Sequence, residues 1–144
     1  MAFFFMDIHE ATKELEKAKV ETNLDGLQLI PFPLGDVYEM GVQQMAIVIP
    51  SLSSLEDAGA PPGSITSPIG QQVPLFGCMD VQQDIGNGVS MTPLFTSMAE
   101  ATDAMNMALD GVSDEDKKKF DVTVMPLTRA VQMQASTPDK SFTY

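Results

Sequence analysis

His9 and Cys78 are the residues of this chain best suited to nucleophilic chemistry, and each is the only one of its type. A Cys–His nucleophilic pair needs both side chains to converge, together with a carboxylate that orients the imidazole. His9 lies in the first turn of a predicted amphipathic helix, and Ala99 holds the matching position in a second copy of that segment. We therefore expect His9 to be a surface residue and expect no such pair.

Other spacings that could support chemistry are also unconvincing. Asp80 and Asp84 flank a glycine-rich turn, but their spacing does not match the alternate-position ligands of a calcium loop. Residues 86–88 are not followed by the lysine and helix of a phosphate-binding loop. The charged block at residues 114–119 is typical of a solvated connection, and one cysteine excludes both an intramolecular disulfide and a paired-cysteine zinc site. We expect no enzyme, no cofactor and no metal ion.

The composition narrows the class of partner. The 144 residues include 20 Asp plus Glu against 8 Lys plus Arg, a formal net charge of −12. This balance argues against nucleic-acid binding, because phosphate neutralisation needs clustered Lys and Arg. It also disfavours docking on an anionic membrane surface, and no apolar run approaches the ~20 residues that span a bilayer. With 44% hydrophobic and 19% charged residues, the chain is typical of one globular folding unit.

An internal repeat is the most informative feature of the sequence. Residues 4–12 match residues 94–102, and residues 27–34 match residues 120–127 in the same order. The repeat predicts an α+β fold of two pseudo-symmetric strand–helix–strand–helix units that share a continuous or nearly continuous sheet and a common core. An added hairpin is expected in the second half.

Helix and strand signals fill in each unit. Asp7 is a predicted helix N-cap with Glu10 as its capping-box partner, and Ser97 takes the same place in the second unit. The alternating patterns at residues 27–29 and 120–124 predict half-buried strands. The first helix is expected to end near residue 19 and to bury Ile8, Ala11, Leu15 and Ala18.

The stretch between the units has a different character. Residues 45–49 predict a strand, and residues 73–79 predict another that turns back through an Asn-Gly sequence toward residues 89–96. The expected organisation is a first repeat at residues 1–50, a Pro- and Gly-rich irregular connection at 51–72, a hairpin with the second repeat at 73–134, and an extended tail at 135–144. All four parts belong to one folded unit.

The first unit lacks a counterpart of the hairpin strand. That counterpart would lie before Met1, so the strand at residues 3–6 is expected to have an open edge. An open strand edge is an aggregation hazard. We therefore expect that the chain is truncated at its start or that another element covers this edge.

Three blocks together resemble a known family. They are residues 2–11, residues 30–50, and residues 73–76 followed by residues 93–100. Their order resembles that of the twenty-two-kilodalton component of the translocon at the inner chloroplast envelope, with its cyanobacterial relatives. The resemblance implies a pseudo-symmetric fold with apolar grooves and a role in escorting proteins across the envelope space. The chain departs from the family pattern at its start and in residues 59–71.

We consider two functional hypotheses, both for a non-catalytic plastid module that binds other proteins and resembles the import component. The favoured one is an accessory subunit of a large thylakoid membrane complex such as a photosystem, peripheral to the thylakoid membrane. The alternative is a soluble chaperone-like component of plastid protein import, in the envelope intermembrane space, with unfolded preproteins as partners.

The preference between the hypotheses depends on the tail, the Pro-rich connection and the open strand edge. The tail has no helical or strand period, yet it carries two aromatic residues of the kind that anchor protein interfaces. The predicted partner-binding residues are Phe142, Tyr144, Phe3, Leu52, Leu55, Ile65 and Ile69.

Overall fold

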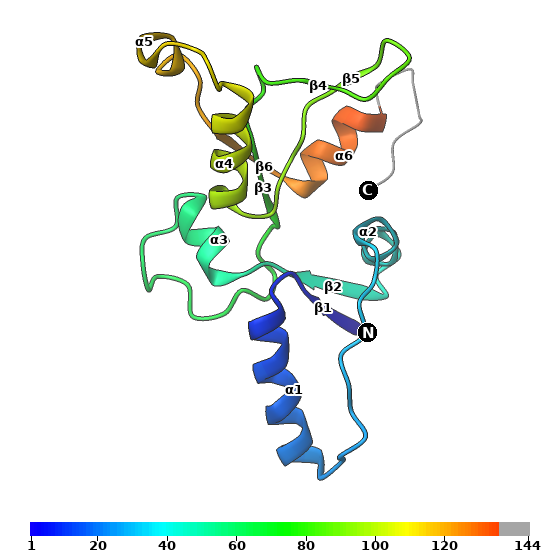
Figure 1. Cartoon of the computed structure of the whole chain (residues 1–144). Coiled ribbons are helices and arrows are strands. Elements are labelled where there is room, and N and C mark those ends of the chain that lie inside the picture. Colours follow the sequence, from blue (N-terminus) through cyan, green and yellow to red (C-terminus); the bar gives the residue numbers. More distant parts are fainter. Residues whose placement is uncertain (136–144) are drawn as a thin grey trace.

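A computed structural model describes residues 1–135 and shows a mixed α and β architecture, which confirms the α+β class (Figure 1). The elements follow in the order β1 (Ala2–Phe5), α1 (Ile8–Thr22), α2 (Leu34–Val42), β2 (Ala46–Ile49), α3 (Leu52–Asp57), β3 (Pro74–Gly77), β4 (Gln83–Asp84), β5 (Ser90–Met91), α4 (Met98–Ala108), α5 (Asp114–Lys117), β6 (Thr123–Pro126) and α6 (Leu127–Ala135). Figure 1 shows α1 projecting from the β1–β2 pair at one end, with α4, α5 and the β4–β5 hairpin at the other.

The strands pair two by two within the described residues. β1 lies parallel to β2, while β3 with β6 and β4 with β5 are antiparallel pairs. The expectation of one continuous or nearly continuous sheet is therefore wrong for residues 1–135. Among these residues the sheet does not continue from one half of the chain to the other, because β1 pairs with β2 alone and β6 pairs with β3 alone. The matched geometry of the two halves stays a prediction.

The hairpin expected for residues 73–96 is confirmed, although its pairing is interrupted. Phe76 and Phe95 exchange backbone hydrogen bonds of 2.7 and 2.8 Å. The pairing resumes at β4 and β5, and the turn between them contains Asn87 at a φ of 56° between two glycines of positive φ. Asparagine and glycine tolerate this left-handed conformation, which a tight hairpin turn requires. Phe95 therefore lies on one side of β3 and β6 on the other.

The start of α1 follows the predicted capping, but its role in packing differs. Asp7 Oδ1 accepts hydrogen bonds from the amides of His9 and Glu10 at 2.8 and 3.0 Å. Glu10 Oε1 does not close a capping box; it accepts a bond from the Leu52 amide at 3.0 Å and so connects the starts of α1 and α3. Ala11 is buried as expected, whereas Ile8 is 69% exposed. The prediction for Ile8 was wrong because this side chain faces a groove on the surface.

Three other expectations need correction. Residues 27–29 form no strand, because residues 24–33 are irregular and include Pro31 and Pro33, which cannot donate to a ladder. The second alternating segment is a strand, but it begins at Thr123 rather than at residue 120. The connection at residues 51–72 is not wholly irregular, because Ser51 caps the short helix α3 by accepting a bond from the Ser54 amide at 3.1 Å.

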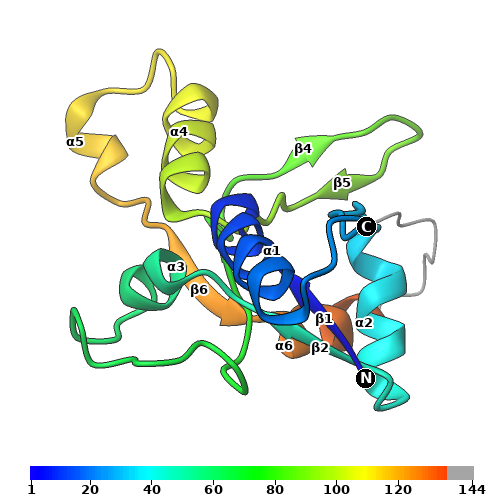
Figure 2. The ribbon, with the colours of Figure 1, turned by 90° about the horizontal axis from the view of Figure 1, so that it is seen from below.

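The core is centred on β3 and draws side chains from both halves of the chain. Phe76 is fully buried, and Val73, Leu75 and Leu127 form a buried cluster. Partly buried residues that pack on this cluster are Met6, Leu34, Tyr38, Val48, Leu94, Met125, Ala130 and Val131. Because these residues come from both halves of the chain, the two halves share one apolar core. Figure 2 shows the ribbon of both halves from below.

Candidate functional site

The residues best suited to nucleophilic chemistry do not form a site. His9 is exposed in the first turn of α1, whereas Cys78 is buried directly after β3. Across residues 1–135, no group of three or more His, Cys, Asp or Glu side chains is arranged to hold a metal ion. The absence of enzymatic activity stays a prediction.

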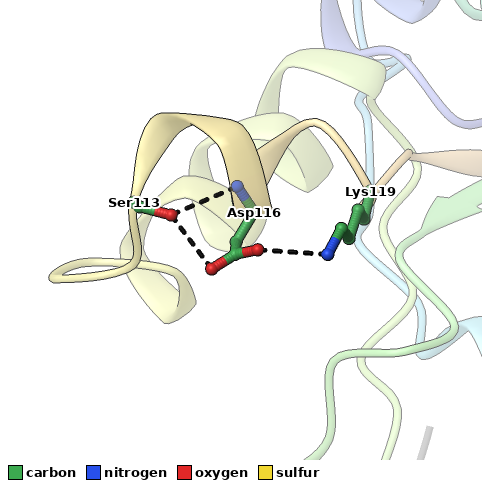
Figure 3. A network of polar contacts seen from close by, with 3 residues as sticks. All are labelled: Ser113, Asp116 and Lys119. Atoms are coloured by element: carbon green, nitrogen blue, oxygen red, sulfur yellow. Dashed lines mark hydrogen bonds and ion pairs between the residues drawn. The ribbon is translucent and has the colours of Figure 1, made fainter.

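The charged block at residues 114–119 contains the short helix α5, whose N-cap is Ser113. Ser113 Oγ accepts a bond from the Asp116 amide at 3.3 Å and donates to Asp116 Oδ2 at 3.0 Å, while Lys119 Nζ reaches Asp116 Oδ1 at 3.1 Å (Figure 3). The Lys119 and Asp116 side chains are 73% and 57% exposed, and such surface pairs contribute little to stability. Asp84 has a comparable local role, because its Oδ1 accepts a bond from the Gly86 amide at 2.8 Å.

The strongest candidate is an apolar groove of about 680 Å³ beside β1. We call it the β1 groove; its walls are residues 3–6 on one side and residues 28–32 on the other, with Ile8, Ala11, Leu34, Val37 and Val48 completing it. Gln28 contributes the one polar side chain among these lining residues. The groove can therefore bind by apolar contact and through its backbone groups, and it offers no group for acid–base or nucleophilic chemistry.

Large apolar side chains along the β1 groove remain exposed to an unusual extent. Ile30 is 65% exposed, Phe3 54% and Phe32 51%. The rings of Phe4 and Phe32 meet edge to face across the groove, with centroids 5.3 Å apart and planes at 76°. Contiguous exposed apolar surface of this kind marks interaction sites on proteins that are otherwise polar outside.

Three acidic residues directly precede lining residues of the β1 groove in the sequence. Asp7 precedes the lining residue Ile8, Glu10 precedes Ala11, and Asp36 precedes Val37. The first 50 residues contain eight Asp or Glu against three Lys, a net charge of −5. A partner that carries basic residues would therefore be attracted to this side of the molecule.

A second apolar hollow of about 400 Å³ lies between the halves of the chain. It is lined by α2 residues such as Tyr38, by residues 46–48 of β2, by residues 70–73 and by the start of α6 at Leu127. It is smaller than the β1 groove, and its lining residues Val73 and Leu127 belong to the buried core cluster. It is the weaker candidate.

The predicted partner-binding residues do not gather in one place. Phe3 lines the β1 groove, while Leu52 at 37% exposure and the buried Leu55 belong to α3. Ile65 is half-buried and Ile69 is 53% exposed in the connection after α3. Leu55 is a core residue at 8% exposure, so its side chain is not available to a partner. The two predicted anchors in the tail, Phe142 and Tyr144, lie outside the described residues.

The sequence-based reasoning missed most of the groove. Ile8 was expected in the core and Leu29 in a strand, and neither Ile30 nor Phe32 was selected. A usable signal was present at residues 30–33, where apolar residues alternate with prolines. Such a segment cannot be a central strand, because proline cannot donate a ladder hydrogen bond. Its large apolar side chains therefore indicate a contact surface outside a sheet.

Known structures of similar shape were found for this chain. Tic22 from Anabaena, described as a protein of protein transport, superimposes with a TM-score of 0.66 and 19% identity, covering 94% of this chain and 69% of that one. Tic22 from Plasmodium falciparum gives a TM-score of 0.67 and 17% identity, covering 95% and 71%. No protein-family model and no curated protein matches the sequence. The chain therefore has the Tic22 fold, the fold that its sequence resemblance implied.

Proposed function

We propose that this chain is a non-catalytic module that binds other polypeptides during plastid protein import. The observation that carries the proposal is the β1 groove, which has large exposed apolar side chains and no catalytic group among its lining residues. The Tic22 fold supports the import context, because one of the similar proteins is described as acting in protein transport.

The physical properties of the groove suit a polypeptide that has not yet folded. Apolar contact is not directional and contributes about 25 cal/mol for each Å² removed from water. Such contacts tolerate many different side chains, whereas polar contacts would select a few. A protein that escorts varied clients needs weak, sequence-tolerant binding of this kind. We propose the envelope intermembrane space of a plastid as the location, and unfolded preproteins as the partners.

The hypothesis of a thylakoid accessory subunit is no longer favoured. It depended largely on tail anchoring through Phe142 and Tyr144, which lie outside the described residues. Both similar structures are named as Tic22, and neither name refers to a photosynthetic complex. Within residues 1–135, no helix is both long and apolar enough to span a membrane.

The proposal is tested by measuring the retention of a labelled plastid preprotein on the immobilised full chain. We expect the urea-unfolded preprotein to bind at micromolar concentration and its folded mature form to remain unbound. The double variant Ile30→Asp, Phe32→Asp should reduce retention about tenfold or more, since it places charge in the groove. Val20→Asp is the matched control, because Val20 is 83% exposed on α1 and does not line the groove. Equal binding of folded and unfolded preprotein, or no binding of either, would refute the proposal.

A further inference from the structure

The turn between β4 and β5 has Asn87 and Gly88 as its two central residues. The Val89 amide donates to the Gly86 carbonyl at 3.1 Å, which closes a tight turn over residues 86–89. Asn87 has a φ of 56° and Gly88 a φ of 73°. Two central residues of positive φ define a type I′ turn, for which Asn-Gly is a preferred sequence. Both residues are exposed, so water has access to the whole tip of the hairpin.

These two residues carry groups that can react with each other. If the backbone nitrogen of Gly88 bonds to Cγ of the Asn87 carboxamide, a five-membered ring closes. Glycine has no side chain to crowd this nitrogen. In the part of the chain that the structure describes, no hydrogen bond uses the Gly88 amide. The amide of Gly86, by contrast, donates to Asp84 Oδ1 at 2.8 Å. The attacking nitrogen is therefore the unprotected one.

The tip of the hairpin has to open before this ring can close. In a type I′ turn the Gly88 nitrogen lies nearly opposite to the Asn87 side chain about the bond between Cα and the carbonyl carbon. Little holds the tip closed, because β4 and β5 pair over two residues each and the Ile85 side chain is 51% exposed. An isolated two-stranded hairpin is marginally stable, and such segments open locally at low free-energy cost.

We propose that Asn87 is a site of spontaneous deamidation with isomerisation of the backbone. The Gly88 nitrogen loses its proton and bonds to Cγ of Asn87, while the bond from Cγ to Nδ2 breaks and ammonia leaves. Water then opens the cyclic imide. Opening at Cγ gives aspartate, and opening at the backbone carbonyl gives isoaspartate, in which the chain continues through the side chain. One water is consumed and one ammonia is released, so no oxidant or reductant is needed.

Isoaspartate changes the hairpin but not the core. It adds one atom to the backbone of the turn, and a two-residue turn fixes the register of its strands, so the β4–β5 pairing should be lost. It also adds a negative charge three residues after Asp84. The hydrogen bonds of 2.7 and 2.8 Å between Phe76 and Phe95 lie beyond the tip and should remain. No residue of the turn lines the β1 groove, so the modification is independent of the proposed function.

The chain supplies internal controls, because its three asparagines have different settings. Asn23 is exposed and has a φ of 54°, but it precedes Leu24, whose branched side chain crowds the attacking nitrogen. Asn106 is exposed within α4, where the helical ladder holds the backbone in place. We expect Asn87 to deamidate about tenfold or more faster than either of the other two.

The test is incubation of the full chain at mildly alkaline pH, followed by digestion and mass spectrometry of the peptides. Isoaspartate is measured as methyl transfer from S-adenosylmethionine by an isoaspartyl methyltransferase. The rate at Asn87 should rise with pH, because the attacking nitrogen must lose its proton. Asn87→Gln should abolish the signal, because the larger ring closes slowly. Gly88→Ala should slow the reaction about tenfold or more, although alanine is strained at a φ of 73° and loosens the turn.

Hydrogen exchange measures the effect on the hairpin. In the isoaspartate form, the Val89 amide should exchange about tenfold or more faster, whereas the Phe95 amide should keep its protection. Asn87→Asp is the matched control, because it adds the charge without the extra backbone atom and Asp-Gly also suits a type I′ turn. The Val89 amide of this variant should exchange within about twofold of the wild-type rate.

Three outcomes would overturn the proposal. Equal rates at Asn87, Asn23 and Asn106 would mean that the Asn-Gly turn has no special reactivity. Deamidation of Asn87 in the urea-unfolded chain but not in the native chain would mean that the hairpin tip stays closed. Formation of aspartate without any isoaspartate would mean direct hydrolysis of the side chain, with no attack by the Gly88 nitrogen.

Discussion

Gly77→Ala is the substitution that most directly tests the packing between β3 and the segment that carries Phe95. A Cβ at this position would lie 2.7 Å from Leu94 Cδ2 and 2.8 Å from the Pro93 carbonyl oxygen. Carbon atoms normally approach to about 3.5–4.0 Å. The Leu94 side chain can rotate away, but the Pro93 oxygen is backbone. It can move only by shifting Phe95, which bonds to β3 at 2.7 and 2.8 Å.

The expected cost follows from these contacts. Overpacking in a well-filled interior destabilises by about 1–3 kcal/mol, and weakening two backbone hydrogen bonds adds about 1 kcal/mol each if they are lost. Replacing glycine also lowers the entropy of the unfolded chain, which returns about 0.4–1 kcal/mol. We expect the free energy of unfolding of Gly77→Ala to fall by about 1–3 kcal/mol.

Urea unfolding followed by circular dichroism measures this difference. With an m value of about 2 kcal/mol/M, the midpoint should fall by roughly 0.5–1.5 M and the slope should stay unchanged. Gly26→Ala is the matched control, because no atom lies within 4 Å of its Cβ position and its φ is not positive. The control should unfold at or slightly above the wild-type midpoint. Coincident midpoints for the two variants would refute the close approach of Leu94 and Pro93 to β3.

Three further predictions concern the core, a helix cap and a surface ion pair. Phe76→Ala should lower the free energy of unfolding by about 3–5 kcal/mol in urea melts, because Phe76 is fully buried, whereas Met107→Ala, at a site 79% exposed, should cost less than about 0.5 kcal/mol. Asp7→Ala should cost about 0.5–2 kcal/mol in the same assay, because two amides at the start of α1 lose their acceptor; no change would show that water replaces the cap. Asp116→Asn should shift the thermal midpoint by less than about 2 °C, and added salt should not change that result, because both charged side chains are more than half exposed.

Features that depend on neighbours in sequence could be predicted without a structure. Asp7 and Ser97 cap their helices because a short polar side chain reaches the amides two or three residues ahead. The hairpin turn at Asn87 follows from the left-handed conformation that asparagine and glycine tolerate. The strand at Ala46–Ile49 and the α+β class were predicted for the same reason, because composition and short-range periodicity determine local conformation.

Strand pairing and exposure were decided by the tertiary structure. An alternating pattern at residues 27–29 predicts a strand only if a partner supplies hydrogen bonds, and none of the described residues does so. Ile8 and Leu55 have similar helical patterns, yet Ile8 faces the β1 groove at 69% exposure and Leu55 is buried at 8%. Burial depends on which distant segment covers a face, and hydrogen bonds between strands join residues far apart in sequence. Residues 3–6 and 28–32 therefore become the two walls of one groove only when the chain folds.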